Sequence, residues 1–233
     1  MRLLVALDFD GVLFNSAYEA YQVCEEVAKS SSKFRNAIHF DEFMEYRSCL
    51  TDAWQFNRLY SHERRLSDFS SLSEVKADSD DWEFAEKFFL ARGELMKNPD
   101  WAKLMSPYPF FYQIRENIRK YPHLFSILST RNIASIQRTL EFYGIPDISI
   151  NGQETIRQYG SKLSVARSLD WMTKDVFTVY VDDMNAHLEP FEGNVDLCIH
   201  AGWGYDESGH ESYTQTQAFN VINGLVAMAV GMK

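Results

Sequence analysis

Two aspartates near the start of the chain, Asp8 and Asp10, are separated by one residue and followed directly by Gly11. Alternate residues of an extended strand share a face, so the two carboxylates are expected to project the same way. Like charges this close repel, and a cation between them would relieve the repulsion. Mg²⁺ is the natural candidate because it prefers hard oxygen ligands. The alternative is a strand that ends in a polar turn, since Asp-Gly is a common turn pair.

Two further apolar runs also end in polar side chains. Residues 124–128 lead into Ser129, Thr130 and Arg131, and residues 176–181 lead into Asp182 and Asp183. Ligands of open parallel sheets bind outside the carboxyl ends of the strands. We therefore expect these polar side chains and the first two aspartates to share one site.

The elements that must position this site alternate between short apolar runs and amphipathic stretches. Strands are predicted for the run before Asp8 and for 124–128, 148–150, 176–181 and 195–200, with helices over 133–143, 161–171 and 221–232. Strands spaced by helices predict a parallel sheet with helices on both faces.

Residues 16–106 contain no convincing strand. Their pattern predicts helical stretches over 17–28, 40–60 and 81–96, separated by polar breaks. We therefore predict a doubly wound, Rossmann-like α/β core formed by residues 1–15 and 107–233, with an inserted all-helical cap domain over 16–106.

Composition restricts the possible partners and compartment. The 233 residues carry a formal net charge of −10, which argues against nucleic-acid binding. Three scattered cysteines favour a reducing cytoplasm over a disulfide framework. No apolar stretch has the length of a membrane span. We expect a cytoplasmic monomer or homodimer that binds neither nucleic acid nor a membrane.

Four motifs occur in a fixed order: DFDGVL at 8–13, ILSTRN at 127–132, Lys162 within GSKLSVARSL, and YVDDM at 180–184. Together they resemble those of the haloacid dehalogenase-like (HAD) hydrolase superfamily. The insertion after the first motif is similar to that of its helical-cap, phosphoglycolate phosphatase-like subgroup.

This resemblance implies a role for each matching carboxylate. Asp8 would be the nucleophile that forms an aspartyl-phosphate, and Asp10 would be the general acid and base. Mg²⁺ would be held by Asp8, the backbone carbonyl of Asp10, and Asp183. Asp183 is favoured over Asp182 as the direct ligand because Asp182 stands where many relatives have glycine. Asp182 would then support the site from beside it.

The resemblance also implies a phosphate-binding set made of Ser129, Thr130 and Lys162. Ser129 has the alternative of a plain helix N-cap, and a lysine at a helix start is commonly a surface residue. The chain departs from the family pattern at two positions. It has His187 where relatives often carry another acid, and Leu163 where they often have proline beside the lysine.

The expected function is that of a Mg²⁺-dependent phosphomonoester hydrolase acting on a small phosphorylated metabolite. A sugar phosphomutase of the same superfamily would keep both aspartates and remains an alternative. A binding or regulatory relative without turnover is a second alternative. The intact set of Asp8, Asp10, Lys162 and Asp183 argues against it.

Overall fold

The computed structural model describes residues 2–30, 33–34, 38–61, 75–145, 147–206 and 211–231. The chain forms two compact units. One contains Met1–Asn15 and Ser106–Lys233, and the other contains Ser16–Met105.

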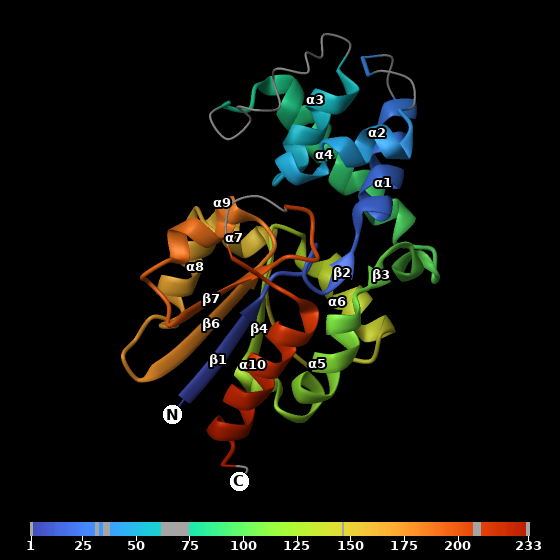
Figure 1. The fold of residues 1–233 in the computed structure, drawn as a ribbon. Helices are drawn as coiled ribbons and strands as arrows, with labels where there is room; N and C mark the ends of the chain where they lie inside the picture. The colour runs from blue at the N-terminus through green and yellow to red at the C-terminus, as the bar shows by residue number, and fades with distance from the viewer. Residues whose placement is uncertain are drawn as a thin grey trace. The chain divides into compact units, whose positions relative to one another are not determined.

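The first unit is built on a six-stranded sheet in which every pairing is parallel (Figure 1). The strand order is β5-β4-β1-β6-β7-β8, so the chain winds outward from β1 in both directions. The strands are β1 (Arg2–Leu7), β4 (Phe125–Leu128), β5 (Ser149–Asn151), β6 (Val176–Asp182), β7 (Leu197–Ala201) and β8 (Ser212–Tyr213).

Helices cover both faces of this sheet, which confirms the predicted doubly wound α/β fold (Figure 1). On one face, Ala6 and Tyr180 pack with Val165 of α8 and Leu188 of α9. On the other face lie α5 and α10. The helices of this unit are α5 (Pro109–Lys120), α6 (Ile133–Phe142), α7 (Gln153–Tyr159), α8 (Lys162–Ser168), α9 (Asn185–Leu188) and α10 (Gln215–Ala229).

Some elements of this unit were not expected from the sequence. Helices α5 and α7 and strand β8 were missed, and the helix expected over 221–232 begins at Gln215, while residue 232 lies outside the described residues. A capping box of Thr214 and Gln217 starts α10. Two short antiparallel strands, β2 (Phe14–Asn15) and β3 (Ser106–Pro107), flank the inserted segment.

The second unit is helical throughout its described regular elements, as predicted, apart from an isolated bridge between Phe34 and Ser61. Its helices are α1 (Ala17–Lys29), α2 (Phe40–Glu45), α3 (Phe56–Tyr60) and α4 (Ser79–Leu95), with 3₁₀ turns at Arg47–Cys49, Ala53–Gln55 and Trp101–Leu104.

The continuous helix predicted over 40–60 is wrong. Leu50 is extended, and the side chain of Asp52 starts a new turn through a capping box with Gln55. Helix α2 has already ended at Glu45, and the extended backbone of Asp52 separates the next turn from the 3₁₀ turn before it.

No helix among the described residues combines the length and apolar character that crossing a membrane requires.

Candidate active site

The carboxyl end of β1 lies between the ends of β4 and β6. Leu7 pairs with Ile127 on one side and with Val181 on the other. The backbone N–H of Asp8 continues this pairing by donating to the carbonyl of Val181 at 2.9 Å. The residues that follow the three strands therefore meet at one edge, as expected for a topological switch point.

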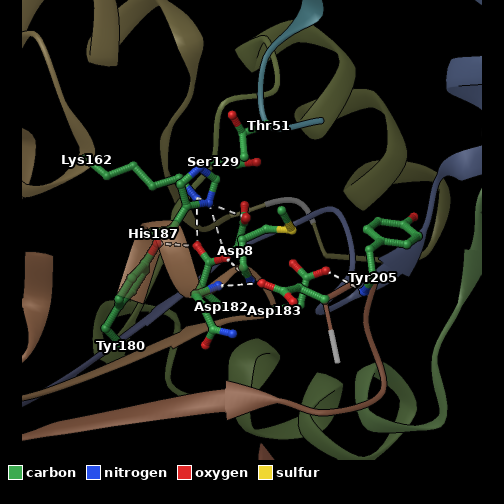
Figure 2. A network of polar contacts seen from close by, with 12 residues as sticks. Asp8, Thr51, Ser129, Lys162, Tyr180, Asp182, Asp183, His187 and Tyr205 are labelled. Carbon is green, nitrogen blue, oxygen red and sulfur yellow. Dashed lines mark hydrogen bonds and ion pairs between the residues drawn. The ribbon is translucent and has the colours of Figure 1, made fainter. Parts of the chain in front are cut away.

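Asp8 is buried and in contact with a cation (Figure 2). Lys162, 154 residues away along the chain, places its Nζ 2.9 Å from Oδ2 of Asp8. The Ser129 hydroxyl donates to the same carboxylate, and the N–H of Phe9 donates to Oδ1 at 2.7 Å. Burial raises the pKa of Asp8 to about 6, against the opposing effect of Lys162.

Asp182 is the second carboxylate on Lys162, whose Nζ lies 2.7 Å from Oδ2. The Tyr180 hydroxyl donates to the same oxygen, and the N–H of Met184 donates to Oδ1 at 2.9 Å. Burial acts to raise the pKa of Asp182, but the groups around the carboxylate, of which the Lys162 ammonium has the largest effect, outweigh burial and hold the pKa well below its usual range. Burial likewise acts to lower the pKa of Lys162, and the two carboxylates raise it.

Asp183 points away from this lysine and packs against two glycines. A Cβ on Gly11 would lie 2.0 Å from Oδ2 of Asp183, and a Cβ on Gly204 would lie 2.2 Å from its Cβ. The N–H of Tyr205 donates to Oδ2 at 2.7 Å. The backbone carbonyl of Asp183 is contacted by Nε2 of His200 at 3.1 Å. Only residues without a side chain allow this carboxylate to reach the loop after β1.

Asp10 pairs with a cation that follows β4. Nη1 of Arg131 lies 2.9 Å from Oδ1 of Asp10. Arg131 is itself held, because its Nε donates to the Ser135 hydroxyl at 3.0 Å and its guanidinium lies 5.5 Å from the Phe9 ring centroid. Its side chain is only 1% exposed, whereas that of Asp10 is 20% exposed. Asp8 is buried, whereas the Asp10 side chain can reach solvent.

Groups at this edge have the donor chemistry that Mg²⁺ prefers. Asp8, Asp183 and the backbone carbonyl of Asp10 are all hard oxygen donors. Gly11 follows Asp10 and has no Cβ, and only for this reason can the carboxylate of Asp183 reach the backbone there. Both oxygens of Asp182 already accept hydrogen bonds, so its carboxylate is directed at Lys162 rather than at this group.

The structure brings together the residues singled out from the sequence. Asp8, Ser129, Lys162 and Asp182 form one hydrogen-bonded cluster, with Asp10 and Asp183 beside it and Thr130 half-buried next to Ser129. Four contributors were not assigned a role from the sequence: Arg131, Tyr180, His187 and Gly204. Arg131 and Tyr180 stand within quoted motifs, and His187 marks a departure from the family pattern. Gly204 lies beyond the last of the four motifs, in the segment that follows β7.

Comparison with known proteins identifies the fold. No family model matches the chain, and no curated protein sequence matches it. A structure from Lactobacillus plantarum, provisionally named a phosphoglycolate phosphatase, is 14% identical over 96% of this chain and 99% of that one, with a TM-score of 0.62. A haloacid dehalogenase-like hydrolase, also provisionally named, from Bacteroides fragilis is 15% identical over 95% and 93%, with a TM-score of 0.58.

A β-phosphoglucomutase from Clostridium difficile is 14% identical over 99% of this chain and 99% of that one, with a TM-score of 0.57. The chain therefore has the fold of haloacid dehalogenase-like hydrolases. The resemblance inferred from the four motifs is confirmed at the level of the fold.

Proposed function

We propose that this protein is a Mg²⁺-dependent phosphomonoester hydrolase that acts on a small phosphorylated metabolite through an aspartyl-phosphate. The observation that carries the proposal is the 2.9 Å contact between Lys162 Nζ and the buried Asp8 carboxylate. This carboxylate lies at the end of a central strand and accepts hydrogen bonds from a lysine ammonium and a serine hydroxyl. Such a group is suited to nucleophilic attack on an anionic group.

In the first step, a carboxylate oxygen of Asp8 attacks phosphorus, and the bond from phosphorus to the leaving oxygen breaks. Asp10, in its acid form, gives its proton to that leaving oxygen. Lys162, Ser129 and Thr130 would bind the phosphate oxygens, so that charge developing on them meets donors already in place.

In the second step, a water molecule attacks phosphorus and Asp8 leaves as a carboxylate. Asp10, now ionised, takes a proton from that water. Arg131, 2.9 Å from Asp10, would hold the side chain in place for this role as base. The partial exposure of Asp10 allows its proton to exchange with solvent between the two steps.

The carboxylates of Asp8 and Asp183 and the backbone carbonyl of Asp10 would hold Mg²⁺. When bound, the metal would neutralise phosphoryl charge and so favour attack by an anionic nucleophile. Asp182 would support the site through Lys162, without contacting the metal.

Structures named as phosphatases and hydrolases share this fold, which supports the reaction class. The three cysteines are free thiols. This agrees with a reducing compartment, and we propose a cytoplasmic monomer or homodimer.

Hydrolysis of an aryl phosphate and of a panel of phosphorylated metabolites, with and without Mg²⁺, tests the proposal. Wild type should release phosphate only with the metal. Asp8→Asn should lose turnover and keep its circular dichroism spectrum, because the amide has almost the same volume as the carboxylate. Wild type as inactive as Asp8→Asn across the whole panel would contradict the proposal.

A sugar phosphomutase is the second candidate, favoured by the likeness to the β-phosphoglucomutase structure. The two differ in the fate of the phosphoenzyme, which a mutase must protect from water until it donates the phosphoryl group again. Rapid phosphate release from a sugar phosphate without an isomerised product would support the hydrolase.

A further inference from the structure

Three side chains that could ligate a metal, Asp8, Asp182 and His187, hold their ligand atoms within 4.8 Å of one another. A cation already lies among them, because Lys162 Nζ contacts all three (Figure 2). The distances are 2.9 Å to Asp8 Oδ2, 2.7 Å to Asp182 Oδ2 and 3.1 Å to His187 Nδ1. This group is therefore a binding site for the lysine ammonium.

The number of donors matches the number of acceptors. A lysine ammonium has three N–H donors and no acceptor, so a hydrogen bond at the 3.1 Å contact requires His187 Nδ1 to accept and to carry no proton. Asp182 Oδ1 lies 3.3 Å from the same nitrogen, farther away than the ammonium. An unprotonated Nδ1 places the proton of a neutral His187 on Nε2. All three donors of Lys162 are then used, two on carboxylates and one on a neutral ring.

Tyr180 is a second group that holds Asp182. Its hydroxyl donates to Oδ2, the oxygen that also receives the ammonium, and its ring stacks on Phe191 with centroids 4.1 Å apart. Tyr180 is fully buried. The stacked ring fixes the hydroxyl, and the hydroxyl fixes the carboxylate that holds Lys162.

We propose that His187 and Tyr180, the latter through Asp182, are positioning residues that hold the Lys162 ammonium on the Asp8 carboxylate. The arrangement also accounts for His187 in place of an acid. A carboxylate there would surround one ammonium with three negative charges, whereas a neutral ring supplies the third acceptor without adding charge. The effect on catalysis rests on the proposed phosphatase function, but the arrangement of the ammonium does not.

Conservative variants separate positioning from packing. His187→Asn keeps an acceptor near the position of Nδ1, while His187→Leu keeps the bulk and removes the acceptor. Tyr180→Phe keeps the stacking on Phe191 and removes the donor. Two exposed residues of the same unit provide matched controls, His123→Leu and Tyr159→Phe.

The direct measurement is the ammonium resonance of ¹⁵N-labelled protein. A lysine held by three acceptors should exchange slowly enough to give a resolved NH₃⁺ signal, which Lys162→Met removes and so assigns. The signal should persist in His187→Asn and both controls, and broaden or disappear in His187→Leu and Tyr180→Phe. The absence of a resolved signal in wild type, or its persistence unchanged in His187→Leu and Tyr180→Phe, would overturn the proposal.

Kinetics supply the second measurement. His187→Leu and Tyr180→Phe should lower kcat about tenfold with KM changed much less. A displaced ammonium would stabilise the transition state less, while its effect on substrate binding would be smaller. His187→Asn should recover most of the loss. A rise in KM with kcat unchanged would overturn the proposed role in catalysis. If wild type is inactive while the ammonium signals behave as expected, the phosphatase proposal fails and the positioning of Lys162 stands.

Discussion

Asp8 combines two properties that a nucleophile needs and that oppose each other. It is buried, which disfavours its charge, and it contacts Lys162 and Ser129, which favour it. Burial is the larger effect, so the pKa stands at about 6, above the usual value for an aspartate. A bound divalent cation would act in the same direction as Lys162 and lower this pKa.

Metal binding should therefore release protons at a defined pH. Without metal, Asp8 is about half protonated near pH 6 and ionised at pH 8, and a bound cation favours the ionised form at both values. Mg²⁺ titrations by calorimetry at pH 6 should give different binding enthalpies in two buffers of different ionisation enthalpy. The difference should equal about half of the difference between the two buffer ionisation enthalpies, because about half a proton is released. At pH 8 the two buffers should agree. Asp8→Asn should remove the difference at pH 6, and a difference that survives in this variant would assign the proton to another group.

At the residue scale, the sequence identified the residues that belong to short motifs. Asp8 and Ser129 could be found because each follows an apolar run, and Lys162 because its segment resembles a family motif. Arg131 and His187 could not be assigned, because their roles depend on distances between segments that only the folded sheet brings together. No local pattern distinguishes an arginine that reaches Asp10 from one at the surface.

At the element scale, the loop between β7 and β8 completes the site. Gly204 in this loop lies against the side chain of Asp183, and Tyr205 binds its carboxylate. The site therefore depends on a segment that follows the last of the four sequence motifs.

Gly204→Ala should displace Asp183 and raise the Mg²⁺ concentration needed for half-maximal activity about tenfold. The added Cβ would lie 2.2 Å from the Cβ of Asp183, a distance that forces a shift. Gly224→Ala is a matched control, since nothing lies within 4 Å of its added Cβ on α10. The control should leave the metal titration unchanged and stabilise the helix by about 0.5–1 kcal/mol. Identical metal titrations for the two variants would contradict the assignment.

The helical unit contains a buried ion pair between α1 and α4. Glu19 accepts two hydrogen bonds of 2.9 Å from Arg92, and the two side chains are 0% and 6% exposed. Arg92→Met should lower the free energy of unfolding by about 3 kcal/mol, because it leaves a buried carboxylate without its cation. The double variant Glu19→Leu/Arg92→Met should recover most of that loss, as measured by urea unfolding. A double variant less stable than Arg92→Met alone would show that the pair is not a simple charge contact.

The central strands of the sheet could be predicted better than the helices. The runs that became β1, β4 and β6 are almost continuously apolar, as buried parallel strands require. The break within 40–60 depends on the side-chain capping of one Asp, which the helical periodicity on either side obscures. Helix α5 carried a usable signal, because Phe110, Ile114 and Ile118 are spaced four residues apart and buried.

At the scale of the whole molecule, the charge distribution is uneven. The net charge is −10, yet two cations, Lys162 and Arg131, are buried beside the site aspartates. The four site aspartates, Asp8, Asp10, Asp182 and Asp183, outnumber these two cations, so a bound Mg²⁺ would offset the excess negative charge that an anionic substrate meets.

Mg²⁺ should stabilise the folded protein against heat, because a ligand that binds only the native state shifts the unfolding equilibrium. At a concentration 100 times the dissociation constant, the gain is about 2.7 kcal/mol. Scanning calorimetry with and without Mg²⁺ should show the shift in wild type and not in Asp183→Asn. Asp147→Asn, at an exposed aspartate, should retain it. An equal shift in all three proteins would place the metal elsewhere.

Asp8 should carry the phosphoryl group during turnover. The most direct measurement is to quench the enzyme in acid during steady-state hydrolysis, reduce the acyl phosphate with borohydride, and locate the modified residue by mass spectrometry of peptides. The expected result is a modification at Asp8 that requires both substrate and Mg²⁺ and is absent from Asp8→Asn. Modification of Asp10 or Asp182 instead, or full turnover with Asp8 never modified, would contradict it.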